Sequence, residues 1–246
     1  MRVVLLYVAV CVFMMGCAQG EKAEKRESQW LAMYNKGKRV GYYQRVRIAE
    51  GDSVVTTELT TLSMDQNTSE PSTLSFNETI ETSSGKLIWF RRETSQSGNM
   101  MRITGTVQDT SIHFVWGVGG QKQESIMPWD SKALMIEGRQ LLAKKQGLKP
   151  GTEYRFQQFL TDFMSVAEVL VVVGEQKEMD LLGEKVLLTE TRELITVQGN
   201  LLEYLVYRDA KFKVMKVVVP NFNLEMINCS EAFATTPPDS IPAVSH

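Results

Sequence analysis

Apolar and polar side chains alternate with a period of two through most of this 246-residue chain, and this pattern limits what the chain can fold into. Alternate residues of a β-strand point to opposite faces, so the pattern is typical of strands packed on one face and in water on the other. The positions that share a face are Val40, Tyr42, Gln44, Val46 and Ile48; Met101, Ile103, Gly105 and Val107; Ile112, Phe114 and Trp116; and Phe222, Leu224 and Met226. The pattern therefore predicts antiparallel β structure, in which one face of a sheet can remain wet.

Turn signals separate these runs at the spacing of β-hairpins. Glycine, asparagine and aspartate cluster at residues 35–38, 50–52, 97–99 and 199–200, and β-branched and aromatic residues are frequent between them. Short loops of this composition connect neighbouring antiparallel strands. We expect a mainly β fold, in which a long antiparallel meander forms a curved sheet or half-barrel.

Residues 131–146 break the alternation and predict one helix. Apolar side chains recur there near helical spacing, at Leu134, Met135, Leu141 and Leu142. Asp130 or Ser131 can cap the start of this helix, and Gly147 can end it. An amphipathic helix within a meander most simply packs on the open face of the curved sheet. The alternative is a linker helix between two small β-units.

The first 17 residues read as an export signal. Arg2 is followed by an apolar run, residues 3–15, that is too short to span a bilayer. Met14-Met15-Gly16-Cys17 resembles the lipobox of bacterial lipoproteins, in which the cysteine thiol is acylated and becomes the new N-terminus. The resemblance implies a signal peptide over residues 1–16 and an extracytoplasmic protein that is anchored to a membrane at Cys17.

The residues that follow Cys17 indicate where the exported protein is located. Ala18 is not the aspartate that, in enterobacterial lipoproteins, favours retention in the inner membrane, so the outer membrane is favoured. Ala18-Gln19-Gly20 also reads as a cleavage site, and a cut after Gly20 would instead release a secreted or periplasmic protein.

Composition divides the remainder into three parts. We expect the lipidated cysteine and a flexible, charged tether over residues 17–28, a β-rich domain over residues 29–229, and a disordered tail that contains three prolines over residues 230–246. The formal net charge of the whole chain is −2, with lysine and arginine scattered along it. This distribution gives no basic patch of the kind that binds nucleic acid.

Short motifs of the predicted domain resemble a known family. Trp30, Tyr34, Gly37, Val40, Gly41 and Tyr42 look like the start of an uncharacterised bacterial extracytoplasmic β-domain often found ahead of transglutaminase-like domains. The segments at residues 147–154 and 182–186 are similar to later turns of that family. The glycines also have a local interpretation, since Gly41 would let a neighbouring strand lie close. We expect no transglutaminase-like Cys-His-Asp set here, so the activity of that companion domain is not assigned to this chain.

Side chains that could support enzymatic chemistry are sparse. The chain has two histidines, and the one conceivable nucleophile pair is Cys229 with His113. No sequence spacing typical of a metal site appears, and the glycines at residues 117–120 read as a hairpin turn and not as a phosphate-binding loop. We therefore expect a protein that is not an enzyme and has no metal or cofactor.

Two functional hypotheses remain. The first is a lipid-anchored interaction or scaffolding domain that binds an envelope protein through a sheet edge or an aromatic cluster, namely Trp30, Tyr34, Tyr42 and Tyr43. The second is a carrier of a lipid or other apolar ligand in a cleft between sheet and helix. The cleft would be lined by Trp116, Trp129, Leu134, Met135, Phe159 and Phe163, since aromatic and methionine side chains adapt to irregular ligands.

The lipid anchor gives a direct prediction. In a bacterial host fed an alkyne-bearing fatty acid, the protein is expected to take up the label, and Cys17→Ser is expected to abolish it because no other N-terminal thiol follows the signal. Cys229→Ser is the matched control and should label normally. An unlabelled wild-type protein whose N-terminus is Glu21 by mass spectrometry would contradict lipidation and support cleavage after Gly20.

Overall fold

Antiparallel strands make up most of the structure, which is a computed structural model that describes residues 25–63, 73–96, 99–118 and 121–236. The predicted signal peptide, Cys17 and residues 18–24 lie outside this range. The strands are β1 Lys25–Asn35, β2 Lys38–Glu50, β3 Ser53–Leu62, β4 Thr73–Thr82, β5 Leu87–Gln96, β6 Asn99–Gln108, β7 Ser111–Val118, β8 Gln121–Pro128, β9 Ala133–Leu134, β10 Glu153–Leu160, β11 Ser165–Leu181, β12 Glu184–Val197, β13 Asn200–Arg208, β14 Val214–Val219 and β15 Leu224–Cys229. The helices are α1 Ile136–Gln146, the short 3-10 helix η1 Pro220–Phe222 and α2 Glu231–Thr235.

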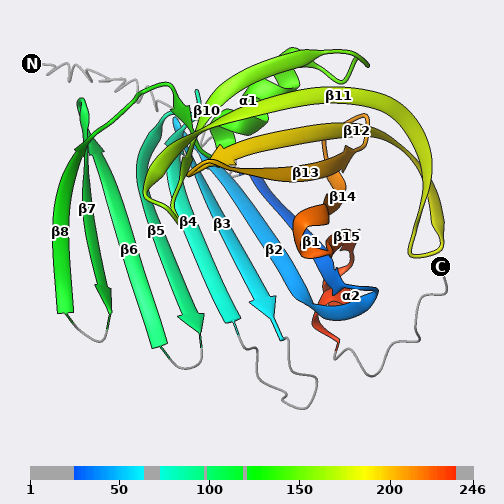
Figure 1. Ribbon diagram of the computed structural model, residues 1–246, viewed down its shortest axis with the longest axis horizontal. Coiled ribbons are helices and arrows are strands. Elements are labelled where there is room, and N and C mark those ends of the chain that lie inside the picture. The colour runs from blue at the N-terminus through cyan, green and yellow to red at the C-terminus, as the bar shows by residue number, and fades with distance from the viewer. Residues whose placement is uncertain (1–24, 64–72, 97–98, 119–120, 237–246) are drawn as a thin grey trace, which may run out of the picture.

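All 15 strands belong to one open sheet made of two meanders. Strands β1 to β8 pair in sequence order, β15 to β9 do the same, and the two runs join where β1 pairs with β15. Every pairing is antiparallel except the short contact of β9 with β10. Strands β8 and β9 are consecutive in the chain, yet they form the two ends of the sheet order. In Figure 1 the first meander forms one wall, and β10 to β13 cross above it. The predicted mainly β, curved meander with a helix packed on it is confirmed.

Irregular pairings allow the sheet to curve into two walls. The register shifts at Met33/Tyr34, Ile80/Glu81, Val173/Gln176 and Tyr207/Arg208. Such bulges bend a strand and increase its twist. Close packing also requires Gly41, where a Cβ atom would lie 1.9 Å from the carbonyl oxygen of Thr61 on β3.

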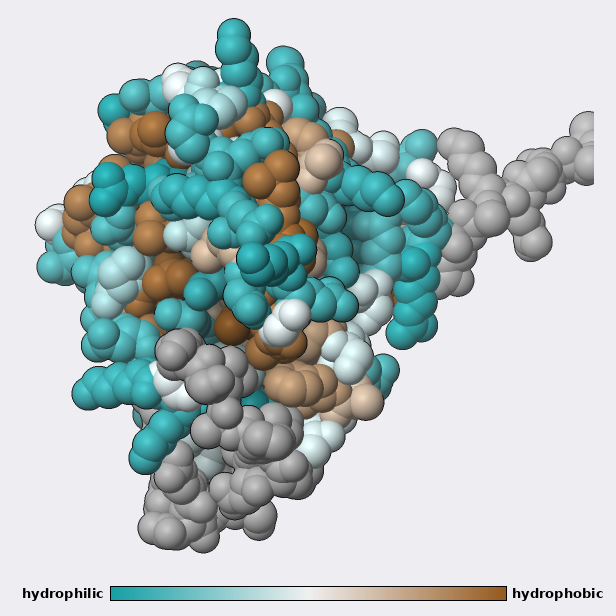
Figure 2. Space-filling view, turned by 90° about the vertical axis from the view of Figure 1, so that its right-hand side faces the viewer, coloured by the Kyte–Doolittle hydropathy of each residue, from teal (hydrophilic) through white to brown (hydrophobic). Residues whose placement is uncertain are grey.

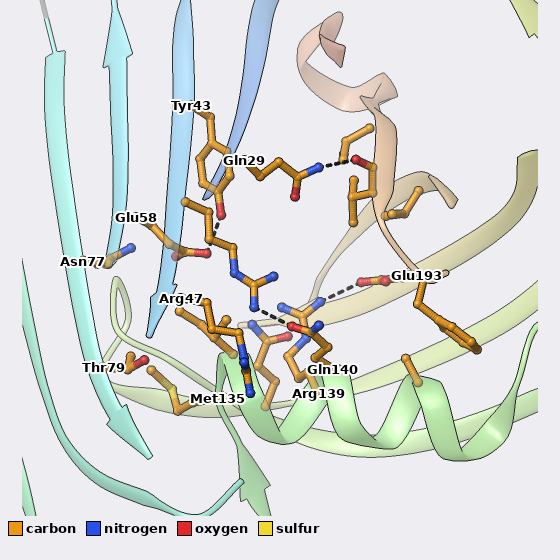
Figure 3. A pocket seen from close by; sticks show the side chains of 18 of the residues that line it. Gln29, Tyr43, Arg47, Glu58, Asn77, Thr79, Met135, Arg139, Gln140 and Glu193 are labelled. Atoms are coloured by element: carbon orange, nitrogen blue, oxygen red, sulfur yellow. Dashed lines mark hydrogen bonds and ion pairs between the residues drawn. The ribbon is translucent and has the colours of Figure 1, made fainter. Parts of the chain in front are cut away.

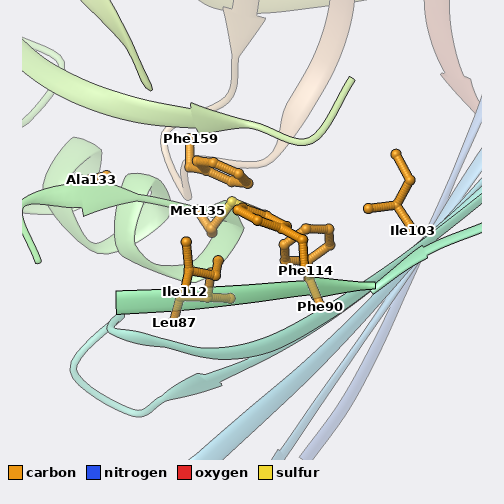
Figure 4. Close-up of a cluster of buried hydrophobic side chains, with 8 residues drawn as sticks. All are labelled: Leu87, Phe90, Ile103, Ile112, Phe114, Ala133, Met135 and Phe159. Atoms are coloured by element: carbon orange, nitrogen blue, oxygen red, sulfur yellow. The ribbon is translucent and has the colours of Figure 1, made fainter. Parts of the chain in front are cut away.

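The largest apolar cluster lies where the two walls meet near α1 (Figure 4). Its aromatic centre is formed by Phe90, Phe114 and Phe159, whose ring centroids lie 5.7 to 6.1 Å apart. Phe114 is 0 % exposed. The cluster consists of Leu87, Phe90, Ile103, Ile112, Phe114, Ala133, Met135 and Phe159. Because these side chains come from both meanders, the cluster holds one wall against the other.

Helix α1 starts later than the sequence predicts and is capped from another strand. Residues 133–134 form β9 instead, and the side chain of Asp130 accepts a hydrogen bond from the amide of Lys132 within its own turn, at 2.9 Å. The buried carboxylate of Glu81 on β4 accepts hydrogen bonds from the backbone amides of Glu137 at 2.8 Å and Gly138 at 3.0 Å. These are among the amides that a helix leaves without a partner in its first turn.

The surface by which α1 packs on the sheet is polar and not the expected apolar stripe. The helical residues that are buried are Glu137 and Gly138. Arg47 on β2 donates two hydrogen bonds of 2.7 Å to the Glu137 carboxylate. A Cβ atom at Gly138 would lie 2.6 Å from the carbonyl oxygen of Gly85, so the helix backbone lies directly against this turn. Helix position therefore depends on an ion pair and a glycine contact.

The predicted domain boundaries move outward at both ends. Residues 25–28, predicted as tether, belong to β1 and continue its pairing with β2, from Lys25 opposite Ala49 to Ser28 opposite Val46. Backbone pairing accounts for this, because their side chains are exposed. At the other end, Ser230 caps α2 within the predicted tail, and Arg39 donates a hydrogen bond to the carbonyl of Ala234. Residues 237–246 lie outside the described range.

The buried Glu81 carboxyl predicts a specific pH dependence of stability. Burial raises its pKa above the usual value of 4.5, although the amides of α1 act in the opposite direction. The folded protein therefore holds this proton more tightly than the unfolded chain, and the stabilisation that this provides is lost as the pH rises through the folded pKa. The wild-type free energy of unfolding minus that of Glu81→Gln is expected to fall as the pH rises from about 4.5 towards neutrality.

Urea unfolding of both proteins across this pH range tests the prediction. Glu50→Gln, at the exposed end of β2, is the control for the loss of one carboxylate elsewhere in the same sheet. A difference for Glu81→Gln that stays flat or increases with pH would contradict the assignment.

Candidate functional site

A cavity of about 970 Å³ lies between the two walls of the sheet and α1 (Figure 3). Its volume is at the upper end of the range of roughly 300 to 1,000 Å³ that is usual for small-molecule sites. The first wall contributes inward-facing residues of β1 to β5, and the opposite wall contributes residues of β10 to β15. Helix α1 with the preceding Met135, and the turns at residues 161–162 and 209–213, complete the lining.

On the first wall, β2 presents Tyr43, Arg45 and Arg47 to the cavity at alternate positions. The Tyr43 hydroxyl donates a hydrogen bond of 2.5 Å to Glu58 on β3. Burial and the neighbouring Glu58 carboxylate raise the pKa of Tyr43 well above its usual value. Tyr43 is therefore a neutral hydrogen-bond donor at physiological pH.

Helix α1 connects both walls through two adjacent side chains. Arg45 donates a hydrogen bond of 2.6 Å to the Gln140 side chain, and Arg139 donates one of 2.8 Å to Glu193 on β12. Figure 3 shows Arg139 and Gln140 rising from the helix, with Glu193 on the opposite side of the cavity. The helix thus forms one end of the cavity and braces its sides.

Positive charge exceeds negative charge around this site. The Glu193 side chain, 7 % exposed, pairs with both Arg139 and Arg208, at 2.8 and 3.1 Å. Two guanidinium groups therefore share one carboxylate. Over the whole lining, nine basic residues face six acidic ones.

The remaining lining is apolar and partly aromatic. The Arg139 guanidinium lies 5.9 Å from the centroid of the Phe156 ring, so the charged and apolar regions adjoin each other. The apolar lining residues are Leu31, Phe90, Met135, Ile136, Ala143, Phe156, Phe159, Leu160, Val171, Ile195, Val206, Phe212, Val214, Val217 and Met226. The cavity therefore suits a molecule that has both an apolar and an anionic part.

The six residues predicted to line an apolar cleft do not lie together in one site. Met135 and Phe159 line the cavity. Trp116 and Trp129 pack against the apolar cluster of Figure 4, and the Trp129 ring lies 5.4 Å from that of Phe159. Leu134 is half-buried in β9, and Phe163 is 44 % exposed.

The four residues predicted as a partner surface also separate. Trp30 and Tyr42 contact each other, with ring centroids 5.4 Å apart. Tyr43 faces the cavity, and Tyr34 lies beyond the register shift of β1. All four are half-buried, so they do not form one exposed aromatic cluster.

The charged lining of the cavity was not predicted from the sequence pattern. Tyr43, Arg45 and Arg47 occupy the face of β2 that alternation predicts to be the wetter one. The one indication in the sequence was that this face of β2 repeats large side chains with polar ends, which can line an enclosed polar site. Period-two alternation separates two faces but does not say that the polar face is enclosed by a second wall.

The conceivable Cys229–His113 pair does not form. Six strands separate β15 from β7 in the sheet order. His113 lies 3.5 Å from Glu124, and the Cys229 thiol lies 3.9 Å from the carbonyl of Trp30. Within the described part of the chain, no three histidine, cysteine or acidic side chains gather as a metal site would require. The helices of that same part are all too short or too polar to cross a membrane.

Comparison with known proteins finds a likeness to a solved structure. No family model matches the sequence, and no curated protein is significantly similar to it. A beta-barrel-like protein of a domain of unknown function, DUF1849, from Brucella abortus is 13 % identical, with a TM-score of 0.48 over 82 % of this chain and 93 % of that chain. A likeness at this level says nothing about what either protein binds.

The shared carboxylate of Glu193 predicts a large effect on stability. Glu193→Gln leaves two partly buried guanidinium groups without a countercharge, and breaking a buried ion pair costs about 3 to 5 kcal/mol. Because the Arg139 side chain is 31 % exposed, we expect a loss near the lower end, about 3 kcal/mol in urea unfolding.

Glu168→Gln is the matched control for this measurement. Its carboxylate pairs with Arg155 at 2.6 Å, but both side chains are largely exposed. Its loss should cost less than about 1 kcal/mol. Equal losses for the two variants would show that Glu193 is not a buried countercharge.

Proposed function

We propose that this protein is a non-enzymatic binding domain of the bacterial envelope, anchored through Cys17, that holds a small amphipathic molecule between its two sheet walls. The cavity beside α1 is the single observation that supports this function most. It has the volume of a small-molecule site, and it combines an apolar lining with hydrogen-bonding side chains. The envelope location and the anchor rest on the lipobox resemblance alone.

An interaction domain remains a second candidate, supported by strand β8. This strand is an end of the sheet order, so among the described residues one of its edges has no partner strand. Free edges of this kind can pair with another chain. Ile126 on β8 is 70 % exposed. On the face that Figure 2 shows, hydrophilic side chains are interspersed with hydrophobic patches.

A substitution that fills the cavity tests the first candidate. Ala143 on α1 lines the cavity, and Ala143→Phe would add a ring there without removing a polar contact. Native mass spectrometry of the chain from Cys17 to His246, purified without detergent, is expected to show an added mass that organic solvent extracts. Ala143→Phe should lack this mass, because the ring occupies the space of the ligand.

Lys145→Phe is the control, since Lys145 is exposed on the same helix and lies outside the lining. It should retain the added mass. Retention by Ala143→Phe, or a wild-type protein that stays ligand-free after incubation with envelope lipids, would count against the binding function and favour the interaction domain.

A further inference from the structure

We propose that the ligand of this cavity is a single-chain amphiphile with an anionic head, whose head contacts Arg45 and Arg139 beside α1 and whose chain lies along the apolar wall. The inference rests on the proposed binding function and adds the chemical class of the ligand and its orientation. Carboxylate and phosphate monoester heads share the required chemistry.

Three arginines of the cavity, Arg45, Arg139 and Arg208, have fewer acidic partners than positive charges, whereas Arg47 and Arg91 each have acidic partners of their own. Arg45 donates its side-chain hydrogen bond to Gln140, a neutral group. Among the described residues, no carboxylate oxygen lies within 4.0 Å of a guanidinium nitrogen of Arg45, so Arg45 has no ion pair. Arg139 and Arg208 divide the charge of Glu193 between them. This surplus is local, because the chain as a whole carries a net charge of −2.

Both guanidinium groups lie at the same end of the cavity. Arg139 precedes Gln140 in α1, and Arg45 donates its hydrogen bond to Gln140. Figure 3 shows Arg139 and Gln140 rising together from the helix into the cavity. Guanidinium groups bind carboxylate and phosphate oxygens by paired, charge-assisted hydrogen bonds that strengthen away from bulk water. An anionic head at this end would supply the missing countercharge.

The wall formed by the last strands favours an apolar chain. Val206, Val217 and Met226 come from β13, β14 and β15 and line the cavity within one apolar cluster. A free inorganic anion would leave this wall in contact with water, and a neutral hydrocarbon would leave the arginines without a countercharge. A molecule with both parts satisfies both regions.

Three probes with the same sixteen-carbon chain separate these possibilities: palmitate, hexadecyl phosphate and the neutral 1-hexadecanol. Binding to the chain from Cys17 to His246 is measured by displacement of a fluorescent apolar dye. At least one anionic probe is expected to bind about tenfold or more tightly than hexadecanol, since hydrogen bonds between charged groups are stronger than those to a neutral hydroxyl. Preference between the two anions identifies a carboxylate or a phosphate head.

Variants of the arginines test the orientation. Arg45→Gln and Arg139→Gln should each weaken binding of the anionic probe about tenfold and leave hexadecanol binding unchanged. Arg155→Gln is the control, because Arg155 is exposed on β10 and outside the lining. Thermal unfolding checks that each variant is folded, and either cavity variant carries the test if the other does not fold.

The outcomes separate this inference from the proposed function. Equal binding of all three probes, unaffected by the arginine variants, would overturn the anionic head while the binding function stands. Displacement of the bound probe by millimolar inorganic phosphate would indicate a free-anion site and would also overturn the inference. If no probe binds and the native protein carries no added mass, both the anionic ligand and the binding function are contradicted.

Discussion

The capping of α1 by the buried Glu81 carboxylate is the interaction on which the arrangement of the cavity depends. The first turn of a helix has amides without partners and a partial positive charge, and a carboxylate satisfies both. Glu81 lies on β4, so the hydrogen bonds that start the helix also attach it to the first wall of the sheet. Arg47 on β2 pairs with the side chain of Glu137, whose backbone amide Glu81 binds. Once these contacts set the helix, its next turn directs Arg139 and Gln140 into the space between the walls.

The polar interior has a physical cost that the network around α1 largely offsets. Removing ions from water is unfavourable unless partners and further hydrogen bonds replace the solvent. Glu137, Glu193 and Glu58 each have such partners between the two walls of the sheet. The arginines are matched less completely than these carboxylates. Under the proposed binding function, an anionic ligand would supply the negative charge that these arginines lack.

Much of the fold follows from local sequence pattern. Alternation and turn residues predicted the antiparallel meander, and the interrupted segment predicted the helix and its end at Gly147. The predicted start of the helix was wrong because the residue that caps it, Glu81, lies more than fifty residues earlier in the chain, where no local signal indicates it. Met135 and Phe159 were expected beside a ligand and do line the cavity, whereas Trp116 and Trp129 belong to the adjoining apolar cluster. Apolar side chains look alike in sequence whether they face a core or a cavity.

By itself, the sequence determined the strand-forming segments, their turns and the two faces of each strand, because these depend on residues close together in the chain. Only the tertiary structure decided which face is enclosed. The pairing of β1 with β15 brings the two meanders together, and their curvature turns the polar face of β2 towards a second wall. Arg45 and Arg47 therefore lie inside the molecule although their pattern is that of a wet surface. The β1–β15 contacts behind this result join residues 189 to 199 positions apart, from Asn35 with Leu224 to Trp30 with Cys229, and no local periodicity records them.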